Sequence, residues 1–382
     1  MFTKSRIALG IVAALLVALL AAACTAAPAA SPSPVPTQPS GEGTPQVNPS
    51  PTPQPMEREE VAAPIESVDV VRLPGGGYSL KIVSGLPSGC AAFKDAVLVR
   101  DGDTLNVSVI NTMPVGVVAC TMIYGYHETD IALDGLTPGG KYTVAVNGSV
   151  TNAFTVLNDE RPMTIGVSPV WSAEVRHADG AYTLVVVSTL PLGSSCSKVN
   201  GFDIVSRYNN RFEVNVTHYR IDESKMDGPV ACTADLPIVS TEIPLGSGLN
   251  AGEHYDVAVN GQPTNSFLAR DPNGPAMTIA EAPIERIDIV RSEMFADEYY
   301  ANVTYRQPRG SSCSDFNGYD VSRESGDTIQ VTVTNLEAAD PNAACTRDLP
   351  VGQVKVPLGR GFESGHTYQV VVNGVSESFT AQ

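Results

Sequence analysis

The stretch YTVAVNG at residues 142–148 returns as YDVAVNG at residues 255–261 and as YQVVVNG at residues 368–374. Successive copies lie 113 residues apart. Alternating valines predict a half-buried strand, and the Asn-Gly pair predicts a tight hairpin, because both residues tolerate the positive φ of a two-residue turn. The chain is therefore a threefold repeat organised around this strand.

Length and composition agree with three β domains. The chain has 382 residues, of which 33 are Gly and 29 are Pro, and long helical patterns are scarce. Alternation of apolar residues in the first copy predicts strands at residues 66–73, 78–83, 96–100, 105–110, 130–133, 142–146 and 153–156. Seven short strands separated by turn residues are typical of an immunoglobulin-like sandwich. We therefore predict an all-β protein of three tandem antiparallel β-sandwich domains.

The approach to the repeated strand supports this class of fold. The segment LTPGGKYTVAVNG at residues 136–148 resembles the approach to the sixth strand of fibronectin type III domains. That resemblance implies that Tyr142 closes the corner of the sandwich. The buried tryptophan usual in such families is missing, because the one tryptophan, Trp171, falls in the first predicted strand of repeat 2. Strand order and the exact family are left open.

The domain plan follows from the repeat. We expect a signal peptide at 1–23, a disordered tether at 24–60 and immunoglobulin-like repeats at 61–157, 167–269 and 281–382. Between repeats the triplet Met-Thr-Ile occurs at residues 163–165 and 277–279. It is either a short linker with a buried methionine and isoleucine, or an extra strand of the following domain. The sequence favours neither.

The N-terminus carries an export pattern. Lys4 and Arg6 precede an apolar run, and Cys24 follows three alanines. This resembles the lipobox of bacterial lipoproteins, although the usual leucine three places before the cysteine is Ala21. The resemblance implies lipidation at Cys24 and a lipid-anchored location at the cell surface or in the cell envelope. An uncleaved anchor and plain secretion are the alternatives. Residues 25–55 contain ten prolines and little to bury, so we expect an extended tether.

The other six cysteines fall two to a repeat. An even number in an exported chain predicts disulfides, and the repeat selects pairing within each copy. The expected pairs are Cys90 with Cys120, Cys196 with Cys232, and Cys313 with Cys345. Each bridge should join the loop after the second strand to the segment after the fourth. A metal site is not expected, because the chain has no Cys-x-x-Cys and no histidine near the cysteines.

Charge and motifs exclude several classes of function. The formal net charge of −17 disfavours binding to nucleic acid. The five histidines lie in different predicted strands and loops, without a nucleophile and base at a repeated spacing. We therefore expect no enzyme, no catalytic residue and no cofactor.

A contact surface is predicted where the copies differ. After the second cysteine, repeats 2 and 3 have Asp-Leu-Pro, whereas repeat 1 has MIYGYH at residues 122–127. Loops on a rigid scaffold often carry binding sites, and aromatic side chains dominate interfaces. Tyr124, Tyr126 and His127 are therefore the candidate contact patch. The alternative is that one tyrosine fills the core and the others are ordinary loop residues.

Two functions are compatible with these features. The first is a membrane-tethered extracellular protein for binding, adhesion or spacing, with an unknown protein or polysaccharide partner. The alternative is a protease inhibitor or chaperone-like protein that uses the loops of its immunoglobulin-like domains. The chagasin-like inhibitors use an Arg-Pro-Trp motif, which does not occur here.

Overall fold

The computed structural model describes residues 56–295, 297–323 and 326–382. These described residues cluster as one compact unit. The described residues form β-strands and one short 3-10 helix, η1 (Glu223–Lys225), which confirms the predicted all-β class. No helix in these ranges is long and apolar enough to cross a membrane. The expected signal peptide, Cys24 and nearly all of the expected tether lie outside the described residues.

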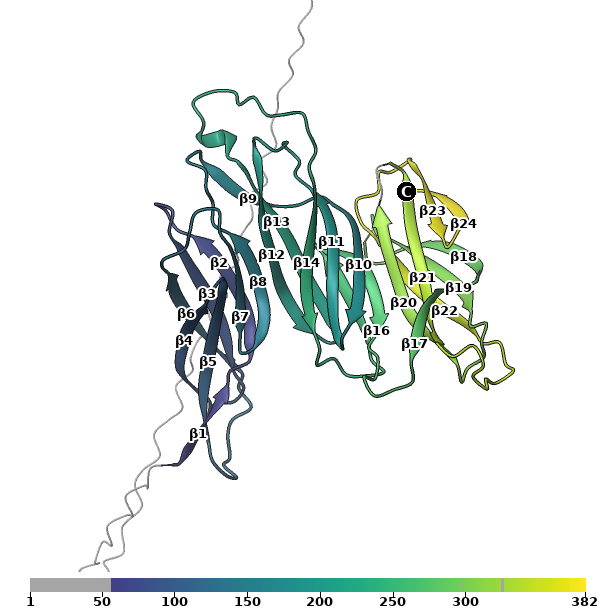
Figure 1. The fold of residues 1–382 in the computed structure, drawn as a ribbon, viewed down its shortest axis with the longest axis horizontal. Helices are drawn as coiled ribbons and strands as arrows, with labels where there is room; N and C mark the ends of the chain where they lie inside the picture. Colours follow the sequence, from purple (N-terminus) through teal and green to yellow (C-terminus); the bar gives the residue numbers. More distant parts are fainter. Residues whose placement is uncertain (1–55, 296, 324–325) are drawn as a thin grey trace, which may run out of the picture. The chain divides into compact units, whose positions relative to one another are not determined.

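Each repeat contains eight strands (Figure 1). Repeat 1 comprises β1 (Arg58–Ala62), β2 (Ile65–Arg72), β3 (Tyr78–Leu86), β4 (Ala92–Asp101), β5 (Thr104–Pro114), β6 (Gly125–Leu133), β7 (Lys141–Val146) and β8 (Ser149–Thr155). Repeat 2 comprises β9 (Met163–Val167), β10 (Val170–Ala178), β11 (Ala181–Thr189), β12 (Ser197–Tyr208), β13 (Arg211–Ile221), β14 (Ile238–Gly246), β15 (His254–Val259) and β16 (Gln262–Leu268). Repeat 3 comprises β17 (Met277–Glu281), β18 (Ile284–Arg291), β19 (Tyr299–Arg306), β20 (Ser314–Arg323), β21 (Thr328–Ala338), β22 (Val351–Gly359), β23 (Thr367–Val372) and β24 (Val375–Thr380). The seven strands predicted in repeat 1 are all present.

The first strand of each repeat is the extra one. β1, β9 and β17 pair with β5, β13 and β21 respectively. The Met-Thr-Ile triplets are therefore strands of the following domain, and the alternative of a linker with a buried isoleucine is wrong. Met163 is buried, whereas Ile165, two residues further along the same face of β9, is 43% exposed. Each repeat thus begins one strand earlier than the ranges 61–157, 167–269 and 281–382.

Two sheets make up each sandwich. In repeat 1, β2, β3 and β6 form a three-stranded antiparallel sheet, and β4, β5, β7 and β8 lie in the other. β5 and β7 are parallel, as are their counterparts in the other repeats. The predicted purely antiparallel arrangement differs at this one pair. The physical reason is that β6 lies in the opposite sheet, so the chain crosses over and returns in its original direction.

Each repeat has its own apolar core. Leu80 and Ile82 from one sheet face Val107, Val109 and Val144 from the other in repeat 1, and all five are buried. The other repeats have equivalent clusters. Burial of apolar surface on both inner faces is the main force that holds such sandwiches together.

The repeated tyrosine closes the corner as expected. The Tyr142 hydroxyl accepts a hydrogen bond of 3.0 Å from the backbone N–H of Thr137. Tyr255 and Tyr368 accept the same bond, also at 3.0 Å, from residues five positions upstream. The hairpin that follows has positive φ at Asn147 and Gly148, 48° and 80°. Both sequence predictions about this stretch are confirmed.

The disulfides join the expected pairs, Cys90–Cys120, Cys196–Cys232 and Cys313–Cys345. Their Cα atoms are 5.5 Å apart in every case. In repeat 1 the bridge ties the loop between β3 and β4 to the loop between β5 and β6. It therefore stabilises the loops at one end of the sandwich rather than linking the two sheets across the core.

Neighbouring repeats are joined edge to edge. β8 pairs with β12, and β16 pairs with β20, both antiparallel, so one sheet continues through all three repeats. The strands approach closely at Gly201 and Gly318. A Cβ there would lie 1.8 Å from the carbonyl oxygen of Ala153 or Ser266 respectively. Each junction therefore requires glycine at this position.

Candidate functional site at the junction of repeats 2 and 3

The predicted contact patch lies on the surface of repeat 1. Tyr124 and Tyr126 are both exposed, and their rings meet edge to face with centroids 5.5 Å apart. The alternative in which one tyrosine fills the core is therefore wrong. His127 behaves differently, because its half-buried ring stacks on Phe93 at 3.7 Å. The structure thus brings together the two tyrosines but turns the histidine toward β4.

Tyr124 is fixed by a charged neighbour. Its hydroxyl donates a hydrogen bond to the Glu66 carboxylate on β2. This bond raises the pKa of Tyr124 to about 12, because deprotonation would remove the donor and place a second negative charge beside Glu66. The phenol is therefore neutral at physiological pH. Met122 and Ile123, which precede it, are exposed and extend this apolar surface.

Glu66 occupies a β-bulge that recurs in every repeat. The register of the first strand of the three-stranded sheet shifts between Ile65 and Ser67 in repeat 1. The same shift occurs in β10 and β18. The extra residues at these bulges are Glu66, Trp171 and Glu285. Bulges re-aim side chains, so this position is one where repeats can differ without changing the fold.

The three bulge residues have different surroundings. Glu66 binds Tyr124, and Glu285 forms an ion pair with Arg306. Trp171, by contrast, is 39% exposed, and among the described residues no hydrogen bond or ring contact holds it. An indole without a structural partner at a re-aimed position is the feature of this junction that points to a ligand.

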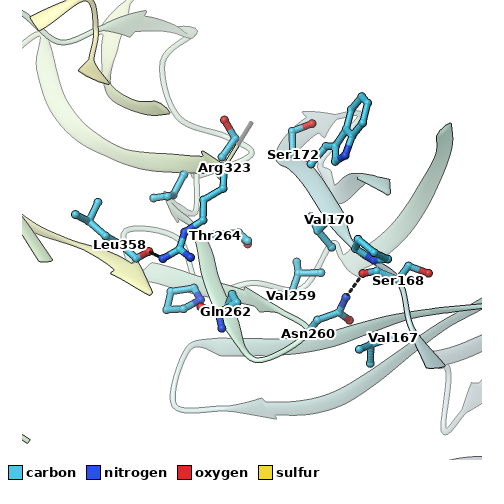
Figure 2. Close-up of a pocket in the computed structure, with 15 residues that line it drawn as sticks. Val167, Ser168, Val170, Ser172, Val259, Asn260, Gln262, Thr264, Arg323 and Leu358 are labelled. Carbon is cyan, nitrogen blue, oxygen red and sulfur yellow. Dashed lines mark hydrogen bonds between the residues drawn. The ribbon is translucent and has the colours of Figure 1, made fainter. Parts of the chain in front are cut away.

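Trp171 lines a cavity of about 320 Å³ between repeats 2 and 3. Figure 2 shows Val170 and Ser172 of β10 on one side, Arg323 and Leu358 of repeat 3 on the other, and Thr264 between them. The cavity is mainly apolar, with two prolines among its lining residues. Its volume lies at the lower end of the range for small-ligand pockets, roughly 300–1,000 Å³.

Several polar groups that line the cavity already make hydrogen bonds within the protein. Asn260 accepts from the Val216 N–H at 2.9 Å and donates to the Ser168 carbonyl at 2.7 Å, the bond dashed in Figure 2. The Arg323 guanidinium donates to the carbonyl oxygens of Leu358 and Arg360 at 2.6 and 2.9 Å. Burial lowers the pKa of Arg323. The guanidinium of Arg323 is therefore already hydrogen-bonded to backbone carbonyls in the wall of the cavity.

The remaining polar groups are suited to binding rather than to catalysis. Ser172 and Ser322 line the cavity, and within the described part of the chain neither hydroxyl has a hydrogen-bond partner. The lining residues include no Asp, Glu, His or Cys that could act as base or nucleophile. Among the described residues no cluster of His, Cys, Asp or Glu could hold a metal ion. An exposed indole, apolar walls and two hydroxyls are therefore what the cavity offers.

The corresponding junction of repeats 1 and 2 provides a comparison. Its cavity of about 270 Å³ has Ile65, Glu66, Ser67 and Arg207 in its lining. Glu66 takes the place of Trp171 in the lining, and its carboxylate is bound to Tyr124, so this cavity has no indole. Trp171 is the only tryptophan of the chain, but its sequence context does not place it in a site. The signal that could have revealed it is that repeats 1 and 3 carry glutamate at this bulge position, whereas repeat 2 carries tryptophan.

Comparison with protein families identifies the repeat unit. The family model of the ORF11 β-sandwich domain matches residues 80–156, 185–269 and 303–381. The chain belongs to this family. The three ORF11 β-sandwich matches contain all six disulfide cysteines, but they begin after the bulged strands, so Trp171 lies outside them. No curated protein and no solved structure matches the chain.

Proposed function

We propose that this ORF11 β-sandwich protein is a non-enzymatic, membrane-tethered extracellular binding protein whose ligand contacts Trp171. The observation that carries the proposal is the exposed, unpartnered indole at the rim of the junction cavity. Aromatic side chains contribute disproportionately to binding, because each offers a large rigid surface with little loss of conformational freedom.

The ligand class follows from the lining. The cavity offers an apolar surface with hydroxyl groups of Ser172 and Ser322, and its one cation, Arg323, is already bound to carbonyl oxygens. A group with an apolar face and hydrogen-bonding edges fits this chemistry better than an anion does. The sugar rings of a polysaccharide have these properties, and so do uncharged segments of a protein partner.

Anchoring to the membrane rests on the sequence. The apolar segment before Cys24 and the proline-rich residues 25–55 support an exported, lipid-anchored protein held away from the bilayer by a tether. Disulfides in every repeat support an oxidising, extracellular location. The proposed partners are therefore the membrane through the N-terminal lipid and a surface protein or polysaccharide through the cavity.

The decisive experiment compares binding by matched variants. The soluble part, residues 57–382, is immobilised and exposed separately to the polysaccharide and protein fractions of a cell-surface extract. We expect Trp171→Ala to reduce capture of one fraction at least tenfold, whereas Tyr126→Ala, which removes an aromatic ring exposed elsewhere, leaves it unchanged. Equal capture by wild type and Trp171→Ala would refute the proposal.

The alternative function also has a specific observation in its favour. Met122 and Ile123 are exposed in a loop that follows the Cys90–Cys120 bridge, next to the paired rings of Tyr124 and Tyr126. A stapled apolar loop is what a protease inhibitor or chaperone-like protein would present to a cleft or an unfolded chain. Loss of capture in Tyr126→Ala alone would favour this alternative.

A further inference from the structure

An asparagine and an aspartate meet at each junction between repeats. Asn265 of β16 donates through Nδ2 to the Ala173 carbonyl at 2.8 Å and to the Asp320 carboxylate on β20. At the other junction, Asn152 donates to the Val68 carbonyl at 2.9 Å and to Asp203 at 2.6 Å. The same arrangement of an asparagine, a backbone carbonyl and an aspartate thus occurs where β8 pairs with β12 and where β16 pairs with β20.

One atom of each asparagine is left without a partner. Asn265 is 1% exposed, and its Oδ1 is buried without a donor in the described structure, as is the Oδ1 of Asn152. A buried acceptor with no donor destabilises the state that contains it. An ionised carboxylate cannot help, because it has only acceptor oxygens.

A proton on the aspartate would complete the arrangement. A protonated Asp320 has one O–H, which could donate to Oδ1 of Asn265 while its other oxygen still accepts from Nδ2. The two side chains would then form a ring closed by two hydrogen bonds. The ionised pair makes only one of these bonds.

The surroundings of Asp320 favour the neutral form. Burial raises the pKa of Asp320 and outweighs the hydrogen bond from Asn265, which lowers it; with the added effect of the Glu174 carboxylate on β10, the pKa is about 6. Glu174 is itself paired with Arg176 on the same strand. β16 and the opposing part of β21 present no titratable group, and Lys355 of β22 lies over the Tyr300 ring. The pKa of Asp203 is raised too, by burial and by the carboxylate of Asp69 on β2.

The two junctions differ in their other supports. Between repeats 1 and 2, the buried hydroxyls of Tyr78 and Tyr219 are 3.2 Å apart, and Tyr219 also donates to the Thr155 carbonyl. By strand register, the counterpart of Tyr219 in repeat 3 is Leu336, which cannot make these bonds. The junction of repeats 2 and 3 lacks this tyrosine pair and is supported beside its Asn–Asp pair by the Arg360 N–H, which donates to Gln262 at 3.2 Å, and by the His254 ring, which lies against Phe316.

We infer that the junction of repeats 2 and 3 is a proton-responsive joint, closed when Asp320 and Asn265 share a proton and loosened when Asp320 is ionised. The residues that follow Asp320, namely Val321, Ser322 and Arg323, line the cavity beside Trp171. The joint therefore controls the width of that cavity. Only this last consequence rests on the proposed function, because the joint itself needs no ligand.

The direction of the pH effect follows from linkage. The folded-state pKa of Asp320 lies above its ordinary value of 3.8. The stabilisation is therefore complete below the unfolded pKa and is lost as the pH rises through about 6. The joint is expected to be tighter at mildly acidic pH than at neutral pH.

Trp171 makes the joint observable, because it is the only tryptophan and lies in this cavity. The emission of residues 57–382 is recorded between about pH 4 and pH 8, which spans the titration window. We expect a transition with a midpoint near 6 in the wild type. Asp320→Asn should abolish it, because its amide donates to Asn265 Oδ1 at every pH. Asp203→Asn, the matched change at the other junction, should leave the transition in place.

Two further measurements separate Asp320 from the other groups that titrate near Trp171. His177 also lies on β10, so His177→Gln must retain the transition. The carboxyl ¹³C resonance of Asp320 titrates in the unmodified protein, and an apparent pKa near its ordinary value of 3.8 would overturn the inference even if a variant misfolds. Persistence of the transition in Asp320→Asn would overturn it as well. Equal ligand capture by the wild type and Trp171→Ala, together with an intact pH transition, would refute only the proposed function.

Discussion

Glu66 and Trp171 occupy the same β-bulge in consecutive repeats, yet one is bound to a tyrosine within its own domain and the other is exposed at a junction cavity. The backbone at the two sites has the same register shift. The difference in chemistry therefore arises from one side chain and leads directly to a first prediction.

Trp171→Glu should leave stability nearly unchanged, because the residue is substantially exposed and the other two repeats fold with glutamate at this bulge. We expect a change in unfolding free energy within about 0.5 kcal/mol, as for surface substitutions. Urea unfolding measures it. A loss several times larger would mean that the indole is a core residue, and the binding proposal would then lose its basis.

Gly318→Ala should destabilise the junction of repeats 2 and 3. The added Cβ would fall 1.8 Å from the Ser266 carbonyl oxygen, so β16 and β20 must separate. We expect a loss of about 1–3 kcal/mol, the usual range for overpacking a tight site. Repeats 2 and 3 should then melt in separate transitions in calorimetry. Gly228→Ala is the control, because nothing lies within 4 Å of its added Cβ, and it should melt like the wild type.

Reduction of the disulfides should weaken every repeat without merging or separating them. Each bridge closes a loop within one repeat, and removal of such a bond from a small domain typically costs about 2–5 kcal/mol. Thermal unfolding with and without reductant tests this. Non-reducing peptide maps should contain no crosslink between repeats, and a peptide joining Cys120 to Cys196 would contradict the pairing.

Cys24→Ser should release the protein from the membrane into the medium. The expectation rests on the basic start, the apolar run and the alanines before Cys24. Fractionation of cells expressing either form, followed by immunoblotting, measures the release. A variant that stays membrane-bound to the same extent as the wild type would show that the apolar segment anchors the chain by itself.

Much of the fold could be predicted because short stretches of the sequence determine its strands and turns. The alternating valines and the Asn-Gly pair at residues 142–148 specify a strand and a hairpin without reference to the rest of the chain, and the repeat assigns the disulfide partners. The parallel pairing of β5 with β7 was not predictable in this way. It depends on which sheet β6 joins, and alternation within a strand does not carry that information.

The candidate site was less accessible to sequence reasoning. Tyr124 and Tyr126 were recognised because aromatic residues in a variable loop stand out. The importance of Trp171 depends on a register shift and on the neighbouring repeat, neither of which a linear pattern reveals. Asn265 and Asp320 are 55 positions apart in the chain and look like ordinary strand residues until β16 and β20 are paired.

The glycine that each junction requires also explains where the sheet stops. By strand register, the counterpart of Gly201 and Gly318 in repeat 1 is Asp95, and the counterpart of Asn152 and Asn265 in repeat 3 is Glu377. The free edges β4 and β24 thus carry charged side chains where the internal edges carry the groups that join them. In many copies held close together on one surface, the carboxylates at these edges would repel one another, and the sheets would not pair edge to edge into fibrils.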